Sequence, residues 1–76
     1  MQRRAALRKR RMSLGLTQQQ AAEKLGISGA YYGMIEQGSR TPRLAMAFKI
    51  ASILNSQVEE VFPEVVLSNR VEASNG

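Results

Sequence analysis

The sequence of 76 residues contains no cysteine, no histidine and no tryptophan, and all six of its acidic residues are glutamates. Without cysteine and histidine, disulfide bonds, thiolate chemistry, zinc sites and imidazole acid–base catalysis are excluded. The glutamate, tyrosine, hydroxyl and lysine side chains that remain show no convergent catalytic set. We therefore expect a binding protein that is not an enzyme and that uses no metal or other cofactor.

Long apolar segments are absent as well. No uninterrupted apolar run approaches the roughly 20 residues that a membrane-spanning helix needs. The first residues, Met1-Gln2-Arg3-Arg4, are not followed by the apolar segment of a secretory signal. A chain of this length buries only about 60% of the surface that its unfolded form exposes, so one core must serve the whole molecule. We expect one small cytoplasmic domain without membrane contact.

Negative charge is scarce in the first part of the chain, although the net charge of the whole is only +5. Residues 1–43 carry nine Lys or Arg and two Glu, whereas residues 44–76 carry two Lys or Arg and four Glu. Six of the cations lie within residues 3–11. This run is compatible with a solvated helix face, a flexible tail, a phosphate-contacting arm or an anionic membrane surface. The apolar face beside it is small, which favours nucleic acid over a membrane.

Two predicted helices have clear start and stop signals. Each follows a hydroxyl residue that can cap free N–H groups, and each ends at a glycine that can adopt the left-handed conformation. The first also fits a capping box, in which Gln20 reaches back to the cap residue. The helices are 18–25, between Thr17 and Gly26, and 29–37, between Ser28 and Gly38.

Three further helices complete an all-α prediction. A basic helix over residues 2–13 is broken at Gly15, Thr41-Pro42 would begin a fourth helix with Asn55 as its C-terminal cap, and a short fifth helix over 58–62 ends before Pro63. No segment has the sustained alternation of a strand. Residues 65–67 are open to a terminal strand, a helix continuation or an apolar segment used in dimer packing. Apolar spacing predicts a core of Leu7, Leu14, Leu16, Leu25, Tyr32, Ile35, Leu44, Ala47, Phe48, Ala51, Leu54, Val58 and Val61.

Two helices joined by a short glycine-containing turn match the helix-turn-helix motif, in which the second helix enters the DNA major groove. Many small bundles contain such a pair, so the identification depends on the neighbouring residues. These are Leu7…Arg11, Gly15-Leu16-Thr17-Gln18, Ala22…Leu25-Gly26-Ile27-Ser28, Ile35-Glu36-Gln37-Gly38, Arg40-Thr41-Pro42, Ala51…Leu54 and Val61-Phe62.

In these residues the chain resembles the phage Cro/repressor-like helix-turn-helix family, also called the xenobiotic-response-element (XRE) family. The likeness covers about residues 3–62. It implies a compact five-helix bundle of the lambda-repressor-like DNA-binding type. The domain would span residues 1–63, followed by a tail over 64–76 that contributes a dimer contact and then frays.

The resemblance also implies individual roles. Arg11 and Glu36 would bridge the first helix to the end of the recognition helix, and Gln18 would meet a DNA phosphate. Arg40 and Arg43 would touch the backbone or the minor-groove edge, unless they are simply exposed charges. The outward positions of the recognition helix would be Ser28, Gly29, Ala30, Tyr31, Gly33, Met34 and Gln37.

Most of these outward positions lack the long polar side chains that usually contact base edges, since only Gln37 has one. Ala30, Met34 and the ring of Tyr31 are suited instead to thymine methyl groups. Alternatively, Tyr31 and Met34 belong to the edge of the core. Gly33 lowers helix stability by about 1 kcal/mol relative to alanine, which indicates that close packing requires it.

The function expected from these features is sequence-specific binding of double-stranded DNA by a stand-alone transcriptional regulator. We expect a repressor that acts as a homodimer on a palindromic operator, with residues 58–67 as the interface. One alternative is an antitoxin or other protein-interaction partner, in which a small protein binds the C-terminal tail and the same domain serves autoregulation. A second alternative is a non-specific RNA or single-strand binder that relies on residues 3–11.

Overall fold

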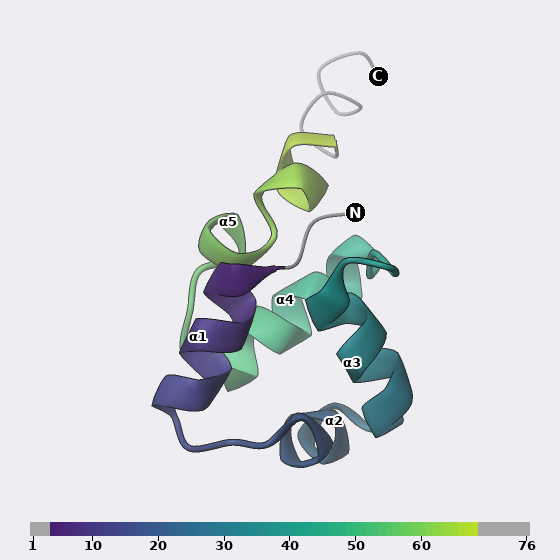
Figure 1. The fold of residues 1–76 in the computed structure, drawn as a ribbon. Helices are drawn as coiled ribbons and strands as arrows, with labels where there is room; N and C mark the ends of the chain where they lie inside the picture. The colour runs from purple at the N-terminus through teal and green to yellow at the C-terminus, as the bar shows by residue number, and fades with distance from the viewer. Residues whose placement is uncertain (1–3, 69–76) are drawn as a thin grey trace.

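The computed structural model describes residues 4–68, and every element within that range is helical (Figure 1). Five helices follow one another, and residues 63–68 form a further helical segment. The all-α prediction is confirmed, with one helical segment more than expected. The predicted helix start at residue 2 and the predicted frayed end from 69 onward lie outside the described residues. The helices are α1 (Ala5–Ser13), α2 (Gln18–Leu25), α3 (Gly29–Gln37), α4 (Leu44–Ile53) and α5 (Val58–Val61).

The two helices of the helix-turn-helix begin and end where the sequence signals place them. The Thr17 side chain accepts a hydrogen bond from the backbone N–H of Gln20 at 3.0 Å, and the Gln20 side chain accepts one from the Thr17 N–H at 2.9 Å. Ser28 caps α3 in the same way, through the N–H of Tyr31. Gly26 and Gly38 end the helices with φ values of 71° and 87°. Local capping therefore determines both helices of the motif.

The predicted start of the fourth helix is wrong. α4 begins at Leu44, after Arg43 in an extended conformation, and not at Pro42. Pro42 is buried, and the Thr41 hydroxyl accepts a hydrogen bond from Arg4 at 3.2 Å. The Thr41 side chain bonds to Arg4 and makes no capping hydrogen bond to α4. At the other end, Asn55 has a positive φ of 53° just after α4, which agrees with its predicted role.

The core lies where all helices meet, but two residues assigned to it are exposed. Phe48 is 53% exposed and Leu14 is 38% exposed. The inner side of α4 is formed by residues 47, 50, 51 and 54, and position 48 lies outside that stripe. The buried apolar residues are Leu7, Ala21, Ala22, Tyr32, Ile35, Ala47, Ile50, Ala51, Leu54, Val58, Val61, Phe62 and Val65.

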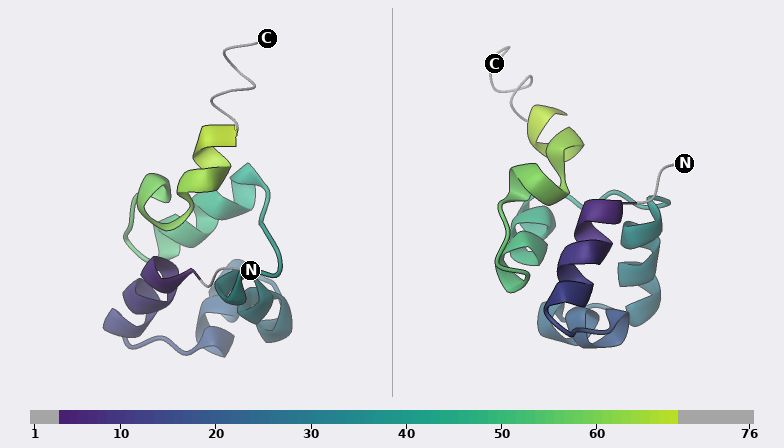
Figure 2. Two further views of the ribbon diagram at one scale, coloured as in Figure 1. Left: turned by 45° about the horizontal axis from the view of Figure 1, so that its top comes forward. Right: turned by 60° about the vertical axis from the view of Figure 1, so that its left-hand side comes forward.

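α2 and the last helical segment lie at opposite ends of the molecule (Figure 1). α2 lies across one end of α1 and α3 and packs mainly on α3, while α4 lies behind them (Figures 1 and 2). The helical segment 63–68 lies at the opposite end from α2 (Figure 1). Its Val65 is buried, so the core continues beyond residue 63. No helix within residues 4–68 is long and apolar enough to cross a bilayer.

Candidate nucleic-acid interface

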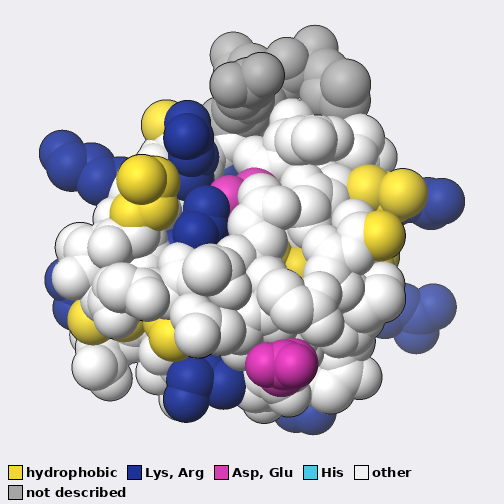
Figure 3. Space-filling model, turned by 60° about the horizontal axis from the view of Figure 1, so that its bottom comes forward, with side chains coloured by type: hydrophobic (Ala, Val, Ile, Leu, Met, Phe, Trp, Pro, Cys, Tyr) yellow, Lys and Arg dark blue, Asp and Glu magenta, His cyan; other side chains and the backbone are white. Residues whose placement is uncertain are grey.

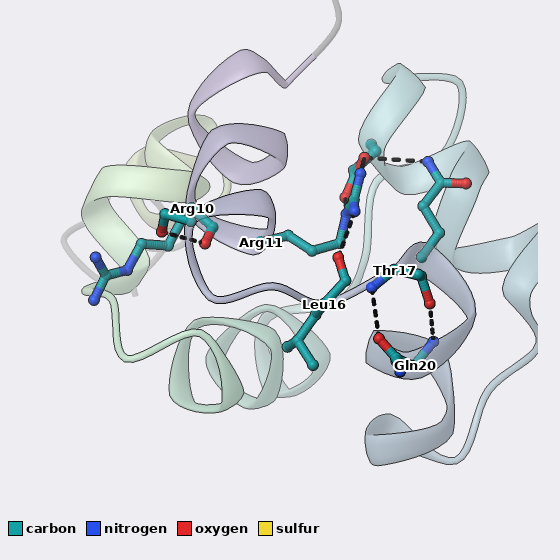
Figure 4. A network of polar contacts seen from close by, with 8 residues as sticks. Arg10, Arg11, Leu16, Thr17 and Gln20 are labelled. Carbon is teal, nitrogen blue, oxygen red and sulfur yellow. Dashed lines mark hydrogen bonds and ion pairs between the residues drawn. The ribbon is translucent and has the colours of Figure 1, made fainter.

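A buried ion pair holds α3 against α1. The Arg11 guanidinium donates from Nε to Glu36 Oε2 at 2.5 Å and from Nη2 to Oε1 at 3.1 Å. Arg11 is 8% exposed and Glu36 is 4% exposed. Arg11 also donates to the carbonyl of Leu16 at 2.7 Å, in the turn before α2 (Figure 4). The bridge expected between these residues is present, and one side chain orients α1, the turn and the end of α3.

The environment of Glu36 favours its charged form. Burial by itself raises the pKa of this carboxyl, but hydrogen bonds from Arg11 and Gln18 outweigh burial and lower the pKa below its ordinary value. Beside the same pair lies Tyr32, whose pKa is raised chiefly by burial and secondarily by the Glu36 carboxylate. Glu36 is therefore ionised at neutral pH, and the pair acts as a fixed structural element.

Gln18, at the start of α2, is tied into this pair. Its Nε2 donates to Glu36 Oε1 at 3.1 Å, which uses one of the two amide hydrogens. The residue is exposed, so the second amide hydrogen remains accessible, as do the unpaired N–H groups at the helix start. Both are suited to a phosphate. The phosphate contact of Gln18 stays a prediction, and its contact with Glu36 was not predicted.

The two glycines of α3 lie against the glutamines of α2. A β-carbon at Gly33 would lie 3.4 Å from Gln18 Oε1, and one at Gly29 would collide with Gln19 Oε1. Gly33 is buried, so its prediction as an outward, DNA-facing position is wrong. The reason is that this side of α3 faces the start of α2. The neighbour of Gly33 is thus a side chain of the protein, and at 3.4 Å it leaves room for a β-carbon, so close packing does not require glycine there.

The remaining predicted positions of α3 differ in their exposure. Ser28, Ala30, Met34 and Gln37 are exposed, whereas Tyr31 is half-buried and packs against the edge of the core. The outer side of α3 thus presents small, apolar and amide groups without a charged side chain. The face that carries α2 and the adjoining helix ends is also mostly uncharged. On this face, lysine and arginine side chains (dark blue in Figure 3) lie mainly around the periphery.

A groove of about 720 Å³ runs between α1 and α3. Arg8 and Lys9 line it from α1, and Gln18 and Gln37 line it from the helix-turn-helix. The site predicted from sequence did not include Arg8 or Lys9. The available signal was the basic run over residues 3–11, which contains both residues. The groove places two cations directly beside the predicted DNA-contacting helices.

Most of the basic run in α1 is occupied within the protein. Arg4 and Arg11 bind backbone and carboxylate groups, and Arg10 donates to the carbonyls of Leu54 at 2.8 Å and Asn55 at 3.0 Å. Within residues 4–68, only Arg8 and Lys9 of this run have side chains without a hydrogen bond or ion pair. Of the five described cations in this run, only Arg8 and Lys9 are therefore available to act as a phosphate-contacting arm.

The loop after α3 carries two more available cations. Arg40 and Arg43 are exposed, and neither side chain has a protein partner in the described part of the chain. The loop backbone is held to the end of α3, since the N–H groups of Ser39 and Arg40 donate to the carbonyl of Met34 at 3.0 and 3.3 Å. The side chains of Arg40 and Arg43 are thus presented from an anchored backbone beside the recognition helix.

The fold and this arrangement define a DNA-binding helix-turn-helix protein, and comparison with known proteins agrees. The family model described as "Helix-turn-helix" matches residues 7–61, and the chain belongs to that family. This confirms the XRE-type resemblance. The family comprises transcriptional regulators and is not an enzyme family. The protein is a DNA-binding transcriptional regulator of the helix-turn-helix class.

Relatives and a solved structure resemble the chain over most of its length. An HTH-type transcriptional regulator of Archaeoglobus fulgidus is 34% identical over 59 residues, which cover 78% of this chain and 84% of the relative. YqaF of Bacillus subtilis, also an HTH-type transcriptional regulator, is 37% identical over 78% of each chain. The crystal structure of the restriction-modification controller protein C.AhdI from Aeromonas hydrophila matches with a TM-score of 0.68 and 33% identity, covering 75% of this chain and 83% of that one.

Proposed function

We propose that this regulator is a cytoplasmic repressor that recognises a specific duplex sequence and binds a palindromic operator as a homodimer. The observation that carries the proposal is the outer side of α3, which is exposed while the buried Arg11–Glu36 pair fixes the helix behind it. A helix held this rigidly can keep base-contacting groups in one register within the major groove. The controller function named for the similar solved structure is compatible with such a role.

Base contacts and phosphate contacts would come from different residues. In the proposed complex, Gln37 hydrogen-bonds a base edge, while Ala30, Met34 and the ring edge of Tyr31 contact thymine methyl groups. The amide of Gln18 and the side chains of Arg40 and Arg43 bind phosphates or the minor-groove edge. Ser28 and the backbone of Gly29 would approach the DNA at the start of α3, while the side of Gly29 that a β-carbon would occupy faces Gln19 of α2.

Dimerisation follows from the small number of base contacts that one copy can make. Doubling them on half-sites roughly 34–36 Å apart brings affinity into the range of regulatory proteins. The surface from Val58 to Leu67 supports this arrangement, since Leu67 is 58% exposed and Val66 is only half-buried. This surface lies at the end of the molecule away from α2 (Figure 2), so pairing there leaves α3 accessible in both copies.

Selection of binding sites from random duplex DNA tests the specificity. We expect enrichment of a two-fold symmetric, thymine-containing motif whose half-sites are about 10 base pairs apart, centre to centre. Tyr31→Ala and Met34→Ala should change which bases are enriched, because they remove apolar contacts. No enrichment, or equal binding to single-stranded polymers, would reject the proposal.

Sedimentation of the free protein and of its complex with the selected duplex tests the dimer. Two copies per operator are expected. Leu67→Lys should weaken their association, whereas Leu14→Lys, which adds the same charge at a partly exposed site away from residues 58–67, should not. A complex with one copy per site would overturn the homodimer, and equal effects of the two variants would overturn the assigned surface.

A further inference from the structure

Arg4 joins three parts of the molecule that are far apart in the sequence. Its side chain is 10% exposed, and all three guanidinium nitrogens donate hydrogen bonds. Nη1 donates to the carbonyls of Ile35 at 2.6 Å and Arg40 at 3.0 Å, and Nη2 donates to the Thr41 hydroxyl at 3.2 Å. The Arg4 side chain therefore holds the end of α3 and the loop that follows it together.

The same guanidinium binds the C-terminal helical segment. Nε and Nη2 donate to Glu64 Oε1 at 3.1 and 2.9 Å, and the guanidinium carbon lies 5.3 Å from the centroid of the buried Phe62 ring. The ring and the carboxylate both favour a cation at this place. In addition, the Arg4 backbone N–H donates to the carbonyl of Glu36 at 2.9 Å. Glu64 thus links segment 63–68 to the Arg4 side chain through a carboxylate that is 53% exposed, while the other partners of the guanidinium lie outside that segment.

These contacts bear on DNA binding because the loop held by Arg4 carries Arg40 and Arg43. Without Arg4, the Ile35 and Arg40 carbonyls and the Thr41 hydroxyl would lose their shared donor. The loop would then be anchored mainly through the bonds from Ser39 and Arg40 to Met34. A less constrained loop presents its two cations in more orientations, which raises the entropic cost of placing them on DNA.

We infer that Arg4 is a positioning residue that couples segment 63–68 to the DNA-contacting loop, so that displacement or rearrangement of this segment changes DNA affinity. The inference rests on the proposed DNA-binding function. It assigns no DNA contact to Arg4 itself, whose donors already have protein partners. Through the Arg4–Glu64 contact, a dimer formed at the C-terminal end would stabilise the loop that binds the operator.

Removing the charge of Glu64 gives a sharp test, because the coupling and simple electrostatics predict changes in DNA affinity of opposite sign. Glu64→Gln removes one negative charge, which by itself strengthens binding to a polyanion. Coupling predicts instead that affinity for the selected duplex falls about threefold to tenfold. Glu23→Gln is the matched control, because Glu23 is an exposed glutamate on α2, outside residues 58–67, whose side chain forms no hydrogen bond or ion pair within residues 4–68. It should leave affinity unchanged or slightly higher.

Amide hydrogen exchange of the free protein separates this inference from the proposed function. With Glu64→Gln we expect exchange at Ser39 and Arg40 to become about threefold to tenfold faster, with no change for Glu23→Gln. Arg4→Lys, which keeps the charge but loses the planar fork, should act in the same direction. If Glu64→Gln leaves the loop exchange unchanged, or tightens DNA binding as removal of the Glu23 charge does, the coupling is wrong. If the wild type binds no duplex but the exchange effect is present, the coupling stands and the proposed function fails.

Discussion

The basic first helix and the loop after the recognition helix both carry arginines, but they use them differently. In α1, Arg10 and Arg11 bind carbonyl and carboxylate groups of the protein itself. In the loop, Arg40 and Arg43 have no side-chain partner within the described residues and are exposed. The densest run of positive charge is therefore mainly structural, while sparser cations nearer α3 remain available to DNA. Charge density along a sequence does not measure the charge that a nucleic acid can reach.

The largest difference between the two regions should appear in stability. Arg11→Ala leaves the Glu36 carboxylate buried without its main partner, which should lower the free energy of unfolding by about 3–5 kcal/mol. Because a domain of this size is marginally stable, much of the variant should be unfolded at room temperature. Urea titration followed by circular dichroism measures the loss. Arg8→Ala, on the exposed side of α1, should change stability by less than about 0.5 kcal/mol. Similar losses in both variants would contradict the distinction.

The buried pair should also make the fold sensitive to acid. Since the pKa of Glu36 is lowered in the folded protein, its stabilising contribution is fully present above the ordinary value of 4.5 and is lost as pH falls through the lower folded value. Urea midpoints should be constant from pH 7 to about 5 and decline below that. Glu36→Gln, although less stable at neutral pH, should show a smaller decline, and Glu59→Gln should show the wild-type decline. Equal slopes in all three proteins would show that Glu36 is not responsible.

A smaller effect is expected in DNA binding. There, substitution of a loop arginine should matter more than substitution of an arginine in α1. Arg40→Ala should weaken binding to all duplexes similarly and reduce the slope of log affinity against log salt by about 0.9 for one lost phosphate contact. Arg10→Ala should leave that slope unchanged, because its guanidinium caps the end of α4. Fluorescence anisotropy at several salt concentrations measures both slopes. If Arg10→Ala reduces the slope as much as Arg40→Ala does, the division between structural and available cations fails.

The smallest predicted effect concerns the contact between α2 and α3. Gly33→Ala adds a β-carbon at 3.4 Å from Gln18 Oε1, a distance of ordinary van der Waals contact. The gain in helix propensity should therefore dominate and raise the free energy of unfolding by up to about 1 kcal/mol. Urea titration would detect this gain. A loss of stability would mean that the two helices tolerate no added atom at this point.

Sequence signals predicted the helix-turn-helix well because its limits depend on neighbouring residues. Thr17, Ser28, Gly26 and Gly38 act on backbone groups within a few positions of themselves, so their roles are visible locally. The predicted start of α4 was wrong, and the Thr41 hydroxyl instead contacts Arg4, 37 residues away. Such a contact leaves no trace in local spacing.

The candidate site was predictable to a similar extent. The Arg11–Glu36 pair and the outward positions of α3 both came from the family resemblance. Gly33 was assigned outward because the sequence alone does not show which side of α3 faces α2. The roles of Arg4 and Arg10 depend on groups 31 or more residues away, so a count of basic residues could not separate them from Arg8.

The most direct test follows backbone amide signals by NMR as the selected duplex is added to the labelled protein. We predict the largest shifts along the outer side of α3, at Ala30, Met34 and Gln37, with further shifts in the loop from Arg40 to Arg43. The outer side of α4, around Phe48, should change little. If the signals of α3 stay fixed while the duplex binds elsewhere, the assignment of this helix as the DNA-contacting element is contradicted.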